Sequence, residues 1–265
     1  MSLPGQRVFI TGASSGIGAA LARAYAARGA TLGLLGRRGE ALDQLRQSLP
    51  APSCHQVYAV DVLDRAALTA AAHDFIAVNG GADIVVACAG ISQGTLTGQA
   101  DDLTNDLAVF DAVFATNVNA TVATFAPFIA AMKTQSTPCR LVGIGSVAGI
   151  RGMRGAGAYC ASKAALHSYC EALRVELRPS NIRVVTIAPG YIDTPMTRAN
   201  RFPMPFLMPP ERFATQAVAA IARGDSFRVL PWQMGVVAKL LRLMPNALFD
   251  RLFARAPTKP RREHP

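Results

Sequence analysis

The chain has 265 residues, of which 51% are hydrophobic and 17% are charged. This balance excludes a disordered chain, and the length allows a large apolar core to form without disulfide bonds or a structural metal. The 27 Lys and Arg residues outnumber the 17 Asp and Glu residues. The resulting net charge of +10 raises the question of an anionic partner, either nucleic acid or a membrane surface.

The cysteines, the histidines and the N-terminal segment give no sign of a metal site or an export signal. The five cysteines lack CxxC spacing and the four histidines lack ligand spacing such as HExxH, so we expect reduced thiols and no metal. The first residues run directly into an apolar strand, and no run approaches 18 uninterrupted apolar residues. We therefore expect a cytoplasmic protein without a membrane-spanning helix.

Short apolar runs alternate with longer helical patterns along the chain. The predicted strands are Val8–Ile10, Thr31–Leu35, Gln56–Val60, Ile84–Ala87, Leu141–Ile144, Arg183–Ala188 and Phe227–Leu230. The predicted helices are Ile17–Ala27, Glu40–Ser48, Ala66–Val78, Leu103–Met132, Ala158–Leu177 and Glu211–Ala222. Uniformly apolar strands that alternate with helices are typical of a parallel sheet covered on both faces. The pattern predicts an α/β, doubly wound, seven-stranded sheet in a single domain over residues 1–230, with an extension over 231–265.

The first predicted strand ends in a glycine-rich loop with the sequence TGASSGIG, and a helix follows at once. We expect Gly12 to allow the tight turn, Gly16 to let backbone N–H groups approach a phosphate, and Gly18 to let helix and strand pack closely. The helix N-terminus would present its positive dipole end to the anion. The loop predicts a dinucleotide site, and the alternative is a tight turn without a ligand. The loop residues expected to contact the cofactor are Gly12, Ser14, Ser15, Gly16, Ile17 and Gly18.

Three polar residues are predicted to meet at the same end of the sheet. Tyr159 and Lys163 share a helix face, and Ser146 follows the fifth strand. Reduction of a carbonyl needs a hydride on carbon and a proton on oxygen, and a tyrosine beside an ammonium suits the proton transfer. We expect Lys163 to lower the pKa of Tyr159, and Ser146 to hold the substrate oxygen. The alternative is a chance pair on an amphipathic helix.

With the Gly-x-x-x-Gly-x-Gly loop, Ser146 and the Tyr-x-x-x-Lys pair, the chain resembles the short-chain dehydrogenase/reductase family over about Arg7 to Thr194. The resemblance implies a Rossmann fold, an NAD or NADP cofactor and oxidoreductase activity. It implies that Lys163 binds the nicotinamide ribose, and that Asn117 links Lys163 through water to a proton relay. The remaining cofactor residues that the resemblance implies are Asp61, Val62, Ala89, Gly90, Tyr159, Pro189, Gly190, Ile192 and Thr194.

The end of the second predicted strand favours NADP over NAD. No carboxylate occurs between Thr31 and Gly39 to accept from a ribose hydroxyl, whereas Arg37 can form paired hydrogen bonds with a 2′-phosphate. Arg38 is expected to cover the adenine or face water, and the alternative is that both arginines are surface residues. Cys88 stands where the family has Asn, so we expect it to be a packing residue that braces the sheet less well.

Residues 194–210 are rich in Pro, Met and Phe and occupy the position of the family's substrate loop. Apolar, adaptable side chains suit a lid that excludes water, so we expect an NADP(H)-dependent enzyme that interconverts a hydrophobic ketone or aldehyde and its alcohol. Arg198 and Arg201 leave open an anionic head group, and with it a 3-oxoacyl thioester substrate. A non-enzymatic NADP-sensing protein is the alternative of a different class.

The C-terminal extension is basic and is predicted to form two short amphipathic helices, the second capped by Asn246. The residues expected on the apolar face of the first are Val236, Val237, Leu240, Leu241 and Met244. Three occupants of that face stay open: an anionic membrane, a second subunit and the substrate cleft. Nucleic acid is not expected, because no reading motif occurs. The family resemblance implies a homodimer or homotetramer formed through helices 103–132 and 158–177.

Overall fold

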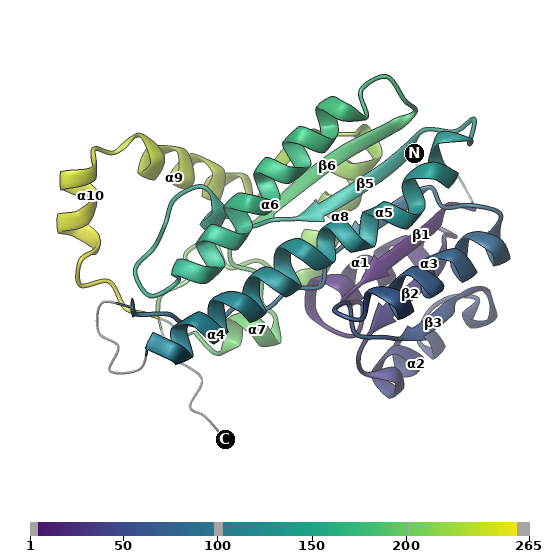
Figure 1. Cartoon of the computed structure of the whole chain (residues 1–265), viewed down its shortest axis with the longest axis horizontal. Coiled ribbons are helices and arrows are strands. Elements are labelled where there is room, and N and C mark those ends of the chain that lie inside the picture. Colours follow the sequence, from purple (N-terminus) through teal and green to yellow (C-terminus); the bar gives the residue numbers. More distant parts are fainter. Residues whose placement is uncertain (1–4, 98–102, 201, 259–265) are drawn as a thin grey trace.

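The computed structural model describes residues 5–97, 103–200 and 202–258, and Figure 1 shows its α/β architecture. Seven parallel strands form one sheet in the order β3-β2-β1-β4-β5-β6-β7. The strands are β1 Arg7–Thr11, β2 Thr31–Gly36, β3 Gln56–Ala59, β4 Ile84–Ala87, β5 Cys139–Ile144, β6 Ile182–Pro189 and β7 Phe227–Leu230. The predicted doubly wound, seven-stranded Rossmann fold in a single domain is therefore confirmed, with every strand near its predicted position.

Helices cover both faces of the sheet. The helices are α1 Gly16–Ala26, α2 Gly39–Gln47, α3 Arg65–Asn79, α4 Leu103–Phe114, α5 Ala120–Lys133, α6 Gly157–Glu176, α7 Pro195–Arg198, α8 Pro210–Arg223, α9 Trp232–Leu243 and α10 Asn246–Phe253. Buried side chains of α1, α2 and α8 form one core cluster with the sheet, and those of α3, α5 and α6 form another on the opposite face. This two-sided burial explains why the inner strands are largely apolar, while the edge strands β3 and β7 keep exposed positions.

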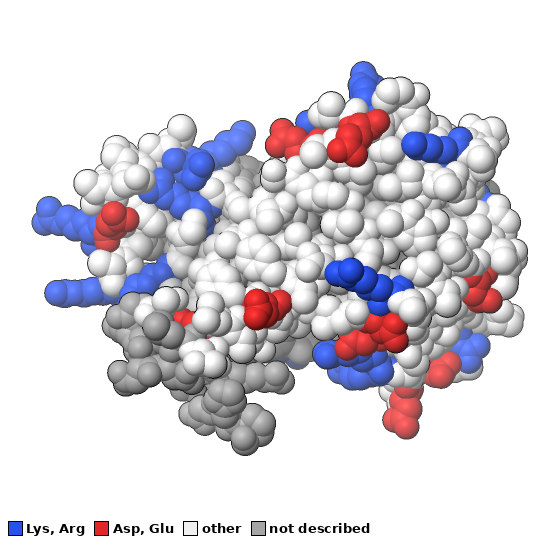
Figure 2. Space-filling view, viewed as in Figure 1, with Lys and Arg blue, Asp and Glu red and all other residues white. Residues whose placement is uncertain are grey.

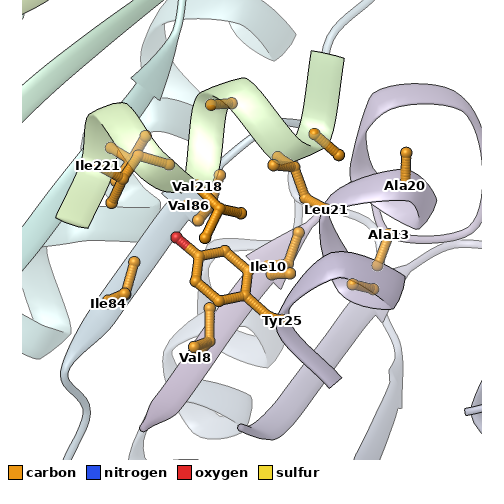
Figure 3. Close-up of a cluster of buried hydrophobic side chains, with 14 of the residues drawn as sticks. Val8, Ile10, Ala13, Ala20, Leu21, Tyr25, Ile84, Val86, Val218 and Ile221 are labelled. Carbon is orange, nitrogen blue, oxygen red and sulfur yellow. The ribbon is translucent and has the colours of Figure 1, made fainter. Parts of the chain in front are cut away.

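Figure 3 shows the core between β1, α1 and α8. The Tyr25 ring of α1 lies among Val8 of β1, Ile84 of β4 and Val218 of α8, and all four are at most 3% exposed. Burial of each such apolar side chain stabilises the fold by about 1.5–3 kcal/mol. This packing holds α1, the helix that follows the glycine loop, against the sheet.

The helix predicted over Leu103–Met132 is continuous, but its hydrogen-bond pattern changes in the middle. A π-helical turn, η3 Ala115–Asn119, joins α4 to α5. By length and composition alone, the segment Thr104–Lys133 is apolar enough to cross a membrane, although it contains no run of 18 uninterrupted apolar residues. Phe125, Phe128 and Met132 within it are fully buried in the core, so the apolar composition of this segment serves the packing of the domain.

The order of the strands reverses between β1 and β4, because the chain fills one side of the sheet with β2 and β3 before it returns to β4. Sheets of this kind bind ligands at the carboxyl ends of the strands, next to the point of reversal. That edge is where the glycine loop and the residue Ser146 emerge. The C-terminal helices α9 and α10 lie beyond β7, at the far left of Figure 1.

Candidate active site

A cleft of about 750 Å³ opens at the carboxyl ends of the strands. Nearly all the residues that the sequence predicts to bind the cofactor or act on the substrate line it. These are Gly12, Ser14, Ser15, Gly16, Ile17, Gly18, Arg37, Asp61, Val62, Ala89, Gly90, Ser146, Tyr159, Lys163, Pro189, Gly190, Ile192 and Thr194. The remaining predicted residue, Asn117, is fully buried behind the wall of the cleft.

At two positions of the glycine loop the neighbouring backbone lies so close that only glycine fits. Gly12 has a φ of +69°, and a Cβ there would lie 2.8 Å from the Cα of Ala89. A Cβ on Gly18 would lie 2.3 Å from the carbonyl oxygen of Gly12, so α1 packs directly on the loop. The loop leads into the N-terminus of the eleven-residue helix α1. A backbone cradle followed by a helix N-terminus fits the pyrophosphate of a dinucleotide.

Thr11 supports the end of β4, where the sequence differs from the family pattern. Its Oγ1 accepts hydrogen bonds from the backbone N–H groups of Cys88 (3.1 Å) and Ala89 (3.3 Å). The end of β4 is thus fastened to β1 by a hydroxyl of β1, although Cys88 replaces the Asn of the family. Burial raises the pKa of the Cys88 thiol to about 12, so this residue stays neutral beside the cleft.

Tyr159, Ser146 and Lys163 meet in the cleft. The Tyr159 and Ser146 side chains are hydrogen bonded to each other. The Ser146 Oγ also accepts from the backbone N–H of Ala148 at 3.1 Å. Lys163 is 5% exposed, and its Nζ donates to the carbonyl of Ile144 at 2.8 Å and lies 5.9 Å from the centre of the Tyr159 ring. A phenol, a hydroxyl and an ammonium therefore share one buried corner.

The expected lowering of the Tyr159 pKa by Lys163 is wrong for this structure. Burial raises the pKa of Tyr159, and the hydrogen bond with Ser146 opposes that rise only in part. Burial also lowers the pKa of the Lys163 ammonium to about 8. Desolvation disfavours the charged form of each group, and burial is the largest cause of both shifts.

Asn117 lies on the π-helical turn η3 and holds two elements together. Its Oδ1 accepts from the Ile91 backbone N–H at 2.9 Å, and its Nδ2 donates to the Ile91 carbonyl at 3.0 Å. Nδ2 also donates to the Ser162 hydroxyl, next to Lys163, at 3.0 Å. Single π-helical turns within α-helices often occur at functional sites, and this one directs an amide to the base of the cleft.

His167 is a site residue that the sequence reasoning missed. It lies on α6 one turn beyond Lys163, and its Nε2 accepts the backbone N–H of Ser146 at 3.3 Å. Burial, assisted by the charge of Lys163, lowers the pKa of His167 to about 4. The ring is therefore neutral near pH 7 and positions Ser146. The one signal in the sequence was its helical spacing from Tyr159 and Lys163.

Two arginines border the end of the cleft at β2. Arg37 Nη1 lies 4.0 Å from Asp61 Oδ2, and Arg38 Nη2 donates to the Ser14 hydroxyl at 3.1 Å. Arg38, which was expected to cover the adenine or face water, thus contacts the glycine loop. Asp61 also accepts from the Leu63 backbone N–H at 3.0 Å. Arg37, Arg38 and Ser14 form a group of donors that fits a phosphate ester.

A second cavity, of about 380 Å³, adjoins the first. Ser146 and Tyr159 line both cavities. The apolar side chains around the second cavity come from the loop after β5, the segment after β6, and helices α9 and α10. They are Val147, Met153, Met196, Phe202, Met234, Val237, Leu241 and Phe253. Arg198, considered above for an anionic head group, is paired with Asp193 at 2.7 Å, and Arg201 lies outside the described residues.

The sequence of the chain matches the family model described as short chain dehydrogenase over residues 6–203. The chain belongs to this family of oxidoreductases. An uncharacterized oxidoreductase of Myxococcus xanthus is 37% identical over 91% of this chain and 93% of its own length.

Two further relatives have names that state a reaction. Galactitol 2-dehydrogenase (L-tagatose-forming) of Cereibacter sphaeroides is 38% identical over 74% of each chain. A 3-oxoacyl-[acyl-carrier-protein] reductase of Chlamydia trachomatis is 32% identical over 74% of this chain and 78% of its own. Among solved structures, a short chain dehydrogenase/reductase from Burkholderia phymatum in complex with NAD has a TM-score of 0.81 at 23% identity, covering 98% of this chain and 99% of its own.

Proposed function

We propose that this protein is an NADP(H)-dependent oxidoreductase that interconverts a hydrophobic ketone or aldehyde and its alcohol, with Tyr159 as general acid and base. The observation that carries the proposal is the position of Tyr159 and Ser146 at the junction of the two cavities. The larger cavity has the glycine cradle and the two arginines, which suit a dinucleotide. The smaller cavity has mostly apolar walls, with Arg151 and Arg154 also lining it, which suits a largely apolar substrate.

When bound, the nicotinamide supplies or accepts the hydride at the substrate carbon. Ser146 donates a hydrogen bond to the substrate oxygen, and Tyr159 transfers the proton at that same oxygen. Its raised pKa keeps the phenol protonated near neutral pH, which suits a proton donor in the reduction direction. Lys163 lies close enough to stabilise the charge on the phenol as its proton leaves.

The test of Tyr159 is the Tyr159→Phe variant, which removes one hydroxyl and little else. We expect carbonyl reduction with NADPH to fall by at least about a hundredfold, the scale of general acid catalysis, while NADPH still binds. Fluorescence titration of NADPH and turnover on a lipophilic ketone measure the two properties. Turnover equal to that of the parent would disprove the role of Tyr159, and a parent that binds NADPH without turnover would favour a sensor.

The NADP preference is proposed from Arg37, Arg38 and Ser14, which surround the end of β2, where β2 itself carries no carboxylate. Hydrogen bonds to charged groups contribute about 1.5–3 kcal/mol. Replacement of both arginines by Ala is therefore expected to raise the KM for NADPH at least about tenfold and to leave the KM for NADH nearly unchanged. Equal effects on both cofactors would argue against a 2′-phosphate site.

The substrate class is proposed from the second cavity, because the related chains differ in their substrates. The names of two relatives specify a sugar alcohol and an acyl-carrier thioester. The apolar lining here favours a lipophilic carbonyl over a sugar. The Chlamydia relative keeps a 3-oxoacyl thioester as the second candidate, although Arg198 is already paired with Asp193. Rates of NADPH oxidation with lipophilic ketones, 3-oxoacyl thioesters and ketoses separate these classes.

We also propose a homodimer or homotetramer that forms through α4, α5 and α6. Three large apolar side chains of these helices are exposed in the single chain: Leu107 (66%), Val122 (39%) and Val175 (63%). Sedimentation velocity of the parent and of a Leu107→Glu, Val175→Glu variant tests this, with dissociation to monomers expected in the variant. A monomeric parent would overturn it.

A further inference from the structure

Helix α9 is apolar on two opposite faces. The inner face borders the second cavity through Met234, Val237, Ala238 and Leu241. The opposite face, here called the outer face, carries residues spaced by three or four positions that are largely exposed. They are Trp232 (68% exposed), Val236 (48%), Leu240 (62%) and Leu243 (80%). A helix that is buried on one side only does not need apolar residues on the other, so the outer face points to a partner.

Helix α10 also carries exposed apolar side chains. Leu248 is 48% exposed and Leu252 is 58% exposed, while Phe249 between them is buried against Arg151. The chain's single tryptophan is Trp232, at the start of the outer face. Tryptophan is enriched where a protein meets the boundary between lipid and water, because its ring is amphipathic. The composition of the two helices therefore resembles that of helices that lie in a membrane surface.

The charge around these helices is positive. Lys239, Arg242, Arg251 and Arg255 are exposed, and Asp250 is the one acidic residue between positions 232 and 255. None of the four basic residues forms an ion pair within the part of the chain that the structure describes. Figure 2 shows basic side chains gathered on the lobe formed by α9 and α10. An anionic surface would complement this charge.

We propose that α9 and α10 dock on the surface of an anionic lipid bilayer, with the outer face of α9 and the exposed leucines of α10 in the interfacial layer. A second copy of the chain fits less well, because a symmetric contact would bring the same basic residues of both copies together. Docking would also place the wall of the second cavity beside the membrane. That consequence for a lipophilic substrate rests on the proposed function, whereas the docking itself does not.

The test uses the full chain and vesicles of phosphatidylcholine with or without phosphatidylglycerol. We expect the protein to float with the anionic vesicles and to bind neutral ones at least about tenfold more weakly. The fluorescence of Trp232 should shift to the blue on binding, because this ring leaves water. Binding should weaken as salt is raised.

Two variants address the two halves of the surface. Leu240→Ser with Leu243→Ser removes apolar area, and Lys239→Glu with Arg242→Glu reverses charge; each should weaken vesicle binding at least about tenfold. The matched controls are Val78→Ser and Lys133→Glu, at exposed sites on α3 and α5. All variants should keep the thermal unfolding midpoint of the parent, since the substituted side chains are exposed.

Several outcomes would overturn docking. These are absence of parent binding to anionic vesicles, unchanged binding by either α9 variant, or an equal loss in the controls. Sedimentation velocity without lipid tests the alternative that a second copy of the chain covers the outer face. If the Leu240→Ser, Leu243→Ser variant changes the oligomeric state of the chain, the outer face is a subunit contact and the proposal fails. Loss of NADPH-dependent turnover has no part in these readouts, so failure of the proposed function would be distinguishable.

Discussion

Three polar residues of α6 lie at successive turns of one helix, and of these Tyr159 and Lys163 line the cleft whereas His167 does not. Tyr159 meets Ser146 through its side chain, Lys163 donates to the Ile144 carbonyl, and His167 accepts the Ser146 backbone N–H. Each contact fixes the end of β5 relative to α6. The geometry of the reacting groups is thus set by backbone as well as side-chain contacts, and a neutral imidazole is part of it.

The state of His167 gives a prediction for stability against pH. Its pKa is about 4 in the folded chain and near 6.5 in an unfolded one, so the unfolded chain binds more protons between these values. The contribution of neutral His167 is therefore complete above pH 6.5 and is lost as the pH falls towards 4. Between pH 7 and pH 5 we expect a loss of about 2 kcal/mol from this residue.

The His167→Gln variant checks this, because the Gln side-chain oxygen can still accept the Ser146 N–H but does not titrate. Urea unfolding at pH 7 and pH 5 should show a smaller decrease in the free energy of unfolding for the variant than for the parent. Identical decreases would show that His167 does not titrate with a lowered pKa. Ser180→Ala on the distant loop before β6 serves as the control.

Thr11 gives a second prediction at this scale. Its buried hydroxyl accepts from two backbone N–H groups, at Cys88 and Ala89. Thr11→Val keeps the shape but leaves both donors without that acceptor, which is expected to cost about 1–3 kcal/mol of unfolding free energy. Thr11→Ser retains the hydroxyl and should lose much less. Chemical denaturation measures the unfolding free energy of the parent and both variants. Equal stability of the Val and Ser variants would contradict the role of the hydroxyl.

These residues mark the limit of what the sequence predicted about the site. Sequence spacing alone was enough to predict that the glycine loop, Ser146, Tyr159 and Lys163 meet in the cleft. His167, Arg38 and Arg151 act through neighbours that are distant in sequence, and no local pattern distinguishes them from ordinary core or surface residues. The raised pKa of Tyr159 depends on burial, which the spacing of residues does not report.

At the scale of elements, periodicity explains both the successes and the errors. The five inner strands are almost entirely buried, so their apolar runs were plain in the sequence, whereas the edge strands β3 and β7 are largely half-buried or exposed. The π-helical turn Ala115–Asn119 adds little to the helical period, so the segment was predicted as one helix. Asn246 was predicted as a helix cap, which is wrong: it lies inside α10, and its Oδ1 accepts from Arg151.

The close contact between α1 and the glycine loop gives a prediction for an element. Gly18→Ala would place a Cβ 2.3 Å from the Gly12 carbonyl oxygen, so the helix or the loop must move. We expect a loss of about 1–3 kcal/mol in stability and weaker NADPH binding. Gly152→Ala is the matched control, because a Cβ there meets nothing within 4 Å. If both variants bind NADPH as the parent does, the packing of α1 on the loop is not required.

At the scale of the whole molecule, one side chain fastens the C-terminal helices to the catalytic domain. Arg151 Nη1 donates to the carbonyls of Leu241 (2.7 Å) and Met244 (2.8 Å), and Nη2 donates to Asn246 Oδ1 at 3.0 Å. Its guanidinium also lies 4.0 Å from the centre of the Phe249 ring. A cation at the C-terminus of α9 satisfies carbonyls that have no partner within the helix and complements the helix dipole.

Arg151→Ala should therefore release α9 and α10 while it leaves the sheet intact. Hydrogen exchange is expected to accelerate at least about tenfold across residues 232–253, because hydrogen bonds from a charged donor contribute about 1.5–3 kcal/mol. Protection of β1, β4 and β5 should not change. Arg174→Ala, which removes an exposed ion pair with Glu171, is the matched control.

Since α9 and α10 wall the second cavity, the Arg151→Ala variant should also raise the KM for a lipophilic carbonyl more than that for NADPH. Unaltered exchange in α9 and α10 would mean that other contacts hold them in place, such as packing on β7 and the hydrogen bond from Arg154 to the Ala256 carbonyl.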